Sequence, residues 1–196
     1  METLYEKITD ALVRDGYIII EEALPQTLNQ QLLAKIDTLT AYKQAGISSS
    51  SALHVDNSRR RDKIHWLDED GGAMSIFLSF SSALQAYLNR SLFLGLCYYE
   101  AHFAKYEEGD FYEKHLDAFQ NSTNRVVTTV YYLNDGWEKE DGGSLRIYDT
   151  DGKFIQEVLP KNNTLVVFLS EKFPHEVLPT KKTRYSIAGW FRIDKK

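Results

Sequence analysis

The first forty residues place apolar side chains at the spacing of helices. Leu4, Ile8 and Leu12 follow at intervals of four, which puts them on one face of a helix. Gly16 ends this pattern, and the apolar run at 17–20 predicts a short strand. The chain should therefore begin with an amphipathic helix, a tight turn and a strand.

Two further helices follow from the same spacing. Pro25 suits the start of a helix, and leucine and isoleucine recur at helical intervals over 28–39. A third helix is expected over 79–90, where Leu84 and Leu88 share one side. Each of these helices needs another layer of structure to cover its apolar face.

A segment poor in apolar residues, 46–72, separates the second helix from the third. It holds adjacent serines at 48–51 and three adjacent arginines at 59–61. One or two short strands should flank it. The arginines fit a solvated turn, but a loop this long inside a compact domain is often functional, so a finger or lid over a site is the alternative.

From residue 92 onward the chain consists of short segments rich in Val, Ile, Thr, Tyr and Phe, separated by turn signals. These segments are LFLGLCYYEAHFAKY, FYEKHLDAF, RVVTTVYYL, GSLRIYD, FIQEVL, TLVVFLS, HEVLP and RYSIAGWFRI. Regularly spaced short strands are typical of a sandwich or jelly roll. We predict a mainly β fold with α-helices, a double-stranded β-helix (jelly roll) whose N-terminal helices pack on one sheet.

One domain over 1–196 is expected, because the chain has no internal repeat and no Pro/Gly linker. Residues 1–91 would form a helical support with a finger loop at about 46–72, and 92–196 the jelly-roll core. The chain carries 23 Lys+Arg against 28 Asp+Glu, a net charge of −5. This gives no overall attraction to nucleic acid or to an anionic membrane. No apolar run approaches the roughly 20 residues that span a bilayer.

The single cysteine, Cys97, cannot form an internal disulfide, and no signal peptide is evident. A reducing, cytoplasmic location is the simplest expectation. Because Cys97 lies in the apolar run SLFLGLCYY, we expect it to be a small core residue.

Two His-X-Asp pairs are the first candidates for chemistry. Residues i and i+2 of a strand point to the same face, so such a pair can hold one metal ion from one side. His115 and Asp117 lie in the predicted strand FYEKHLDAF, whereas His54 and Asp56 lie in the serine- and arginine-rich loop. We therefore take His115 and Asp117 as the candidate metal ligands.

A third ligand should come from a later strand, and His175 is the only histidine after His115. Two histidines and one aspartate form a facial triad, which leaves open positions on Fe(II) for a cosubstrate and O2. A structural zinc site would be closed by four ligands.

Arg184 follows His175 by nine residues, with a turn at Pro179–Thr180 between them. We expect the two residues on adjacent antiparallel strands, with Arg184 pointing into the same cavity. Its planar guanidinium can bind one carboxylate of a dicarboxylate cosubstrate.

The order His-Leu-Asp, His175 and Arg184 resembles the Fe(II)- and 2-oxoglutarate-dependent dioxygenases. Within them the chain is most similar to the oxygen-sensing (HIF-type) prolyl hydroxylases and their bacterial relatives. The stretches that carry the resemblance are RRRDKIHWLDED, AKYEEGDFYEKHLDAF, RVVTTVYYLNDGWEKEDGGSLRIYD and FPHEVLPTKKTRYSIAGWF. The resemblance implies Fe(II), 2-oxoglutarate and O2, with ascorbate as a candidate reductant and succinate and CO2 as products.

The resemblance also implies roles for single residues. Tyr132 would join Arg184 at the far carboxylate of 2-oxoglutarate, and Tyr106 would lie near the metal and the cosubstrate. Arg125 and Trp190 would line the substrate entrance. The segment around Asp62 would correspond to the finger that closes over the substrate.

The implied reaction is hydroxylation of a prolyl residue in a cytoplasmic protein, with a translation factor as one candidate. Two alternatives stay open. The same chemistry could act on a free amino acid or another small metabolite, although the long finger favours a peptide. The fold could also serve as a noncatalytic sensor or binding module, but such proteins usually lose a ligand or the arginine.

Overall fold

The computed structural model describes residues 2–49, 52–54, 58–118 and 124–194. Three helices, one short 3-10 helix and thirteen strands are assigned in this part of the chain. In chain order they are α1 (Glu2–Arg14), β1 (Tyr17–Ile20), α2 (Gln26–Thr38), β2 (Lys43–Gln44), β3 (Ile47–Ser49), β4 (Ala52–His54), β5 (Lys63–Trp66), α3 (Ala73–Leu92), β6 (Tyr98–Tyr106), β7 (Tyr112–His115), β8 (Arg125–Tyr132), η1 (Lys139–Asp141), β9 (Leu145–Tyr148), β10 (Phe154–Val158), β11 (Leu165–Leu169), β12 (His175–Val177) and β13 (Arg184–Arg192).

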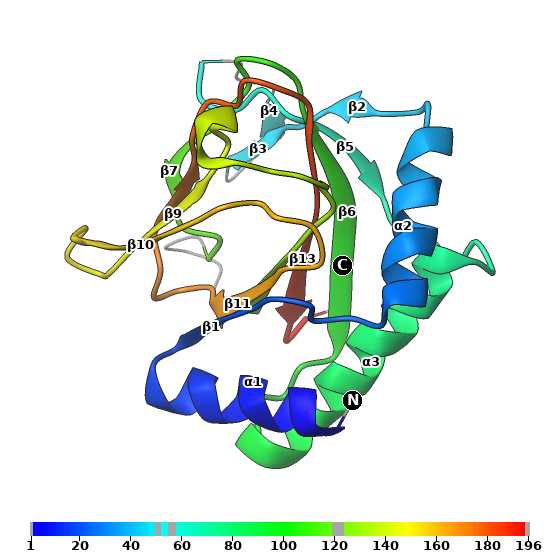
Figure 1. Cartoon of the computed structure of the whole chain (residues 1–196). Coiled ribbons are helices and arrows are strands. Elements are labelled where there is room, and N and C mark those ends of the chain that lie inside the picture. Colours follow the sequence, from blue (N-terminus) through cyan, green and yellow to red (C-terminus); the bar gives the residue numbers. More distant parts are fainter. Residues whose placement is uncertain (1, 50–51, 55–57, 119–123, 195–196) are drawn as a thin grey trace.

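Two facing antiparallel sheets form the jelly roll (Figure 1). The major sheet has the order β1-β11-β8-β13-β6-β5-β2, and the minor sheet has the order β10-β9-β12-β7. The strands β3 and β4 form a separate hairpin. The predicted fold class, a jelly roll with N-terminal helices, is thereby confirmed.

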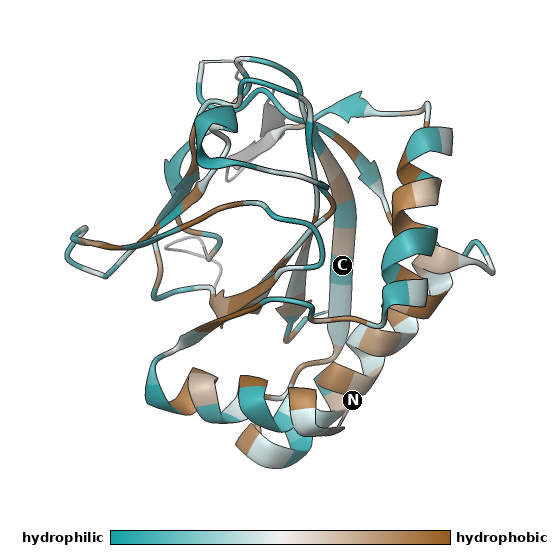
Figure 2. Cartoon of the chain, viewed as in Figure 1, coloured by the Kyte–Doolittle hydropathy of each residue, from teal (hydrophilic) through white to brown (hydrophobic). Residues whose placement is uncertain are grey.

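The three helices cover the outer face of the major sheet, as Figure 1 shows for α2 and α3 beside β6. Ile8, Leu32 and Leu84 belong to the same buried cluster as Phe103 and Ile187 of the sheet. Along α1 and α2, brown apolar positions alternate with teal polar ones in Figure 2. Burial of this apolar face, at roughly 25 cal/mol per Å², holds the helical layer on the sheet.

The inner faces of the two sheets form a second cluster. Side chains of the major sheet such as Tyr106, Tyr132 and Phe168 pack there against Ile147 and Val177 of the minor sheet. Because successive residues of a strand point to opposite faces, each major-sheet strand supplies one set of side chains to the helices and the other set to this interior. Tyr106, Tyr132 and Arg184 of the candidate site come from the major sheet, whereas His115 and His175 come from the minor sheet.

The predicted third helix was too short, because α3 begins at Ala73 rather than near residue 79. The predicted strand from residue 92 begins only at Tyr98. The segment 46–72 is less irregular than expected, since it contains the hairpin β3–β4 and the strand β5, which pairs with β6. None of the helices in the described part of the chain has the length and apolarity needed to cross a membrane.

Cys97 is exposed rather than part of the core, which corrects the sequence-based expectation. It lies in the connection that leads from α3 into β6, where its backbone N–H donates to the carbonyl of Arg192. The apolar run that contains Cys97 extends from the end of a helix to the edge of a sheet. Its apolar character alone does not show which of its side chains face the core.

Candidate active site

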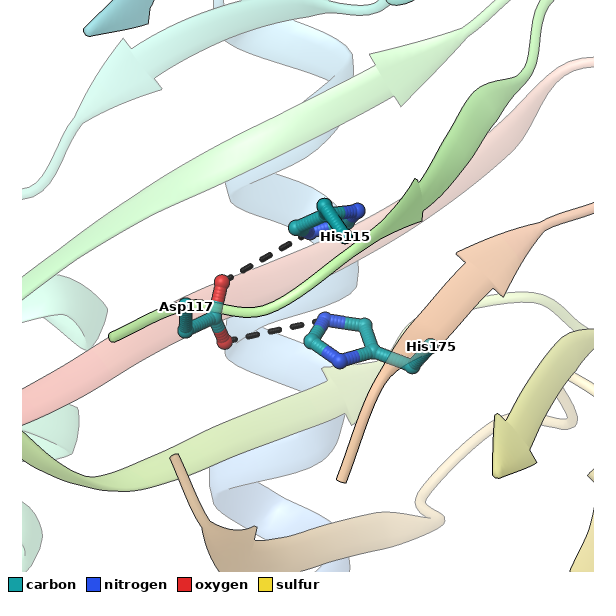
Figure 3. A group of neighbouring side chains, drawn as sticks. All are labelled: His115, Asp117 and His175. Carbon is teal, nitrogen blue, oxygen red and sulfur yellow. Dashed lines mark ion pairs between the residues drawn. The ribbon is translucent and has the colours of Figure 1, made fainter. Parts of the chain in front are cut away.

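Three candidate metal ligands converge from two segments of the minor-sheet side (Figure 3). His115 ends β7 and is paired across the sheet with His175, the first residue of β12. Asp117 lies two residues beyond the end of β7. The prediction that His115 and Asp117 share one strand was therefore wrong, although the two side chains do meet.

The ligand atoms of the three residues all lie within 4.8 Å of one another. His115 Nε2 is 3.6 Å from Asp117 Oδ1, and His175 Nε2 is 3.6 Å from Asp117 Oδ2. This is the spacing expected of groups that surround a common point about 2 Å from each of them.

Backbone carbonyls orient both imidazoles. His115 Nδ1 lies 2.7 Å from the carbonyl of Glu113, and His175 Nδ1 lies 2.9 Å from the carbonyl of Phe173. A carbonyl only accepts, so each Nδ1 carries the proton and each Nε2 keeps a lone pair. The lone pairs face Asp117, as a metal site requires.

The Asp117 carboxylate is buried and held by the major sheet. Thr128 Oγ1 donates to Asp117 Oδ2 at 2.8 Å, and Ser170 Oγ lies 2.8 Å from the same threonine hydroxyl. Burial alone would raise the pKa of Asp117, but His175 and His115 outweigh it and hold that pKa well below its usual range. Burial lowers the pKa of His175 to about 4. At neutral pH Asp117 is thus an anion beside the neutral imidazole of His175, the protonation states in which these two groups bind a divalent metal.

Arg184 enters the interior from the major sheet. It opens β13, which pairs with β6 and β8, whereas His175 lies on β12 of the minor sheet. The expectation that His175 and Arg184 occupy adjacent strands was therefore wrong. The two residues face each other across the jelly roll instead.

The Arg184 guanidinium is 1% exposed and positioned by neutral groups. Nε donates to the carbonyl of Gly143 at 2.9 Å, and Nη1 donates to Ser186 Oγ at 3.2 Å. Among the described residues no carboxylate lies within ion-pair distance of it. A buried cation without an anion is costly, so this position fits an anionic ligand.

Gly142 and Gly143 pack closely against the backbone of Pro179 and the side chain of Arg184. Both have positive φ, +71° and +66°, the backbone conformation that favours glycine. A Cβ at Gly142 would lie 2.4 Å from the carbonyl oxygen of Pro179, and one at Gly143 would lie 3.0 Å from Arg184 Cδ. Only glycine fits both the backbone conformation and the space.

Two tyrosines flank the guanidinium. Arg184 Cζ lies 4.8 Å from the ring centre of Tyr106 and 5.1 Å from that of Tyr132. Tyr132 is fully buried, and its hydroxyl has no hydrogen-bond partner among the described residues. Burial raises the pKa of Tyr132 to about 12, so the hydroxyl stays protonated and can donate to a ligand. Burial likewise raises the pKa of Tyr106.

The residues expected at the substrate entrance lie together on the inner face of the major sheet. Arg125 Cζ lies 3.8 Å from the ring centre of Trp190, which is 6% exposed. Arg125 also donates to Glu100 Oε1, from Nη2 at 2.9 Å and from Nε at 3.3 Å. Trp190 lies 5.4 Å, ring centre to ring centre, from the buried His102.

Asp62 is fully buried, and its carboxylate forms an ion pair with Arg60. Arg60 donates to both of its carboxylate oxygens, at 2.6 and 2.9 Å. The guanidinium of Arg60 also covers the ring of Tyr112, and that ring stacks on His115 at 3.6 Å between ring centres. Asp62 therefore connects the segment before β5 to a candidate metal ligand. In the competing His54/Asp56 pair, Asp56 lies outside the described residues.

Sequence reasoning missed Thr128 and Glu100, which lie in β-rich segments where nothing in the local pattern distinguishes them. Their importance follows from partners that are distant along the chain, and no local signal could have found them. The prediction that the arginines at 59–61 form a solvated turn was wrong for Arg60, whose side chain is 12% exposed and paired with the buried Asp62.

These residues fit iron and a keto-diacid. Two imidazole lone pairs and one carboxylate leave coordination positions open, which suits Fe(II) with a chelating cosubstrate. The buried Arg184 and the unpartnered Tyr132 hydroxyl suit the far carboxylate of 2-oxoglutarate.

The comparisons with known proteins agree with this geometry. A family model described as the 2OG-Fe(II) oxygenase superfamily matches residues 101–192. The prolyl hydroxylase EGLN3 of Homo sapiens is 31% identical over 199 aligned positions, which cover 95% of this chain and 82% of that protein. The chain belongs to the 2OG-Fe(II) oxygenase superfamily. The resemblance found in the sequence is confirmed, and so is the expectation of an enzyme.

Two solved prolyl hydroxylase structures extend the match to nearly the whole chain. A Pseudomonas putida prolyl-4-hydroxylase superposes with a TM-score of 0.87 at 36% identity, covering 97% of this chain and 100% of that one. A prolyl hydroxylase from Trichoplax adhaerens, solved with a hypoxia inducible factor peptide fragment, gives 0.85 at 26% identity, covering 97% and 90%. Relatives of this 2OG-Fe(II) oxygenase are thus prolyl hydroxylases in bacteria and animals.

Proposed function

We propose that this oxygenase hydroxylates a prolyl residue within a protein or peptide. The observation that carries the proposal is the convergence of His115, Asp117 and His175 on one point, across the interior from a buried and anion-free Arg184. The prolyl hydroxylases among its relatives indicate the substrate class, and one of them was solved with a peptide fragment.

His115, Asp117 and His175 would hold Fe(II) through two Nε2 atoms and one carboxylate oxygen. When bound, Fe(II) together with 2-oxoglutarate and O2 supplies the oxidising chemistry that places a hydroxyl on a C–H bond, with succinate and CO2 as products. Glu113 and Phe173 fix the imidazoles through their carbonyls, so the ligand set is preorganised. A requirement for ascorbate stays a prediction.

Arg184 would bind the far carboxylate of 2-oxoglutarate through the guanidinium edge that Gly143 and Ser186 do not use. The Tyr132 hydroxyl would donate to the same carboxylate, and Tyr106 would close the pocket beside it. Because Arg184, Tyr132 and Tyr106 are all buried, these charge-assisted hydrogen bonds would be stronger than at the surface.

Arg125 and Trp190 would contact the substrate at the entrance, and the segment that contains Asp62 would contribute one rim of it. The substrate would be a protein of the cytoplasm, in keeping with a single cysteine and no possible internal disulfide. The translation factor named above stays a prediction. We also propose that residues 1–196 act as one catalytic domain.

Incubation of the purified protein with Fe(II), 2-oxoglutarate, O2 and proline-containing peptides tests the proposal. The expected results are succinate release and a mass gain of one oxygen on a proline, both abolished in Asp117→Ala. Hydroxylation of free proline with no reaction on peptides would instead support the small-metabolite alternative. No succinate release with either substrate class would support the noncatalytic sensor.

A further inference from the structure

A buried carboxylate lies beside the proposed substrate entrance. Glu100 is 4% exposed and sits on β6 directly opposite Trp190 of β13. Its Oε1 atom accepts from Arg125 Nη2 at 2.9 Å and from Arg192 Nη1 at 2.9 Å. A carboxylate this deep is retained only when charged hydrogen bonds offset its desolvation.

Glu100 fixes the Arg125 guanidinium in one orientation. Two Arg125 nitrogens bond to Glu100, and Arg125 Cζ lies 3.8 Å from the Trp190 ring centre. The side chain of Arg125 keeps 24% of its surface exposed, so its remaining edge can reach a ligand. Because Arg125 is already held by Glu100 and Trp190, its side chain loses little conformational entropy when it binds a ligand.

This arrangement is close to the metal ligands. Trp190 pairs with Thr128 on β8, and Thr128 donates to Asp117. Thr128 therefore links the Arg125–Trp190 pair to a candidate metal ligand.

The two arginines that bond to Glu100 face two carboxylates, Glu100 and Asp194. Arg192 has a second acid, Asp194, whose oxygens accept at 2.9 and 3.1 Å. Asp194 therefore offsets the charge of Arg192, and Glu100 offsets the charge of Arg125. A guanidinium whose charge is already matched should favour an uncharged acceptor, such as a peptide carbonyl, over an acidic side chain.

We propose that Glu100 is a positioning residue that aims Arg125 at a main-chain carbonyl of the substrate and makes the entrance indifferent to charged side chains beside the target proline. The inference rests on the proposed function, because it concerns the same peptide. It assigns to Glu100 a role in substrate selection rather than in binding iron or 2-oxoglutarate.

The test compares wild type with Glu100→Gln on three peptides that differ only in an Asp, Ala or Lys beside the hydroxylated proline. Wild type should show similar kcat/KM on all three. Glu100→Gln should raise the KM for the Ala peptide about tenfold, since a neutral amide oxygen holds the Arg125 guanidinium more weakly than a carboxylate does. It should also prefer the Asp peptide over the Lys peptide about tenfold, because the Arg125 charge is now unbalanced.

The control is Glu157→Gln on β10, which removes the same charge and breaks a more exposed ion pair, with Arg146 (3.0 Å), on the other sheet. It should leave the peptide preference unchanged. Unaltered charge preference in Glu100→Gln would overturn the proposal, as would an equal rise in the KM for 2-oxoglutarate, which would indicate a general structural loss. If Glu100→Gln fails to fold, Arg125→Lys should reproduce the higher KM. If wild type hydroxylates no peptide, the proposed function fails first.

Discussion

Replacement of Arg184 by lysine tests the cosubstrate pocket most directly. Lysine keeps the charge but loses the planar fork, and with it the donor to Gly143 and a bidentate grip on a carboxylate. One charge-assisted hydrogen bond contributes about 1.5–3 kcal/mol. A loss of about 2 kcal/mol corresponds to a Kd for 2-oxoglutarate that is about 30-fold higher.

The size of the effect can be expressed as a thermal shift. At a 2-oxoglutarate concentration of about 100 times Kd, the wild type should gain about 2.7 kcal/mol of stability. For a chain of this length that is about 5–10 °C in Tm. At the same concentration Arg184→Lys should gain only about 0.9 kcal/mol, or about 2–3 °C.

The assay is thermal unfolding with Mn(II) at fixed concentration, without O2, with and without 2-oxoglutarate. Arg146→Lys, at a guanidinium on the minor sheet whose side chain is 41% exposed, is the matched control and should keep the wild-type shift. A wild-type shift in Arg184→Lys would refute the assignment of the cosubstrate carboxylate to this pocket.

Three further substitutions probe the support of the site. Thr128→Val removes the donor to Asp117 and should weaken Mn(II) binding about tenfold in calorimetric titration, whereas unchanged affinity would contradict a role in holding the ligand. Asp62→Ala leaves the Arg60 guanidinium buried without its anion and should cost about 3–5 kcal/mol in urea unfolding; a loss below about 1 kcal/mol would disprove the strength of that pair. Gly142→Ala places a Cβ 2.4 Å from the carbonyl oxygen of Pro179 and should lower the free energy of unfolding by more than about 1 kcal/mol. An unchanged midpoint in urea unfolding would contradict this expectation.

Local patterns predicted a large part of this molecule. The spacing of Leu4, Ile8 and Leu12 corresponds to α1, and the β-branched run corresponds to β1. These predictions succeed because helix and strand periodicity depend only on neighbouring residues and on one apolar face. The candidate ligands His115 and Asp117 were also accessible, since they lie close together in the chain.

Pairing between distant strands was not accessible from such patterns. A turn at Pro179–Thr180 suggested that His175 and Arg184 share a hairpin, yet β12 pairs with β7 and β9 while β13 pairs with β6 and β8. Apolar alternation states which face of a strand is buried but not which strand lies beside it. The jelly-roll crossover places the two residues on opposing sheets.

By itself the sequence determined the helices, most strands and the residue types of a metal site with its arginine. Only the tertiary structure decided that Asp117 leaves the strand, that Asp62 is buried against Arg60, and that Glu100 lies beneath Arg125. The physical reason is that buried charges acquire their roles from partners far along the chain. Those partners are chosen by the packing of two sheets and not by any local repeat.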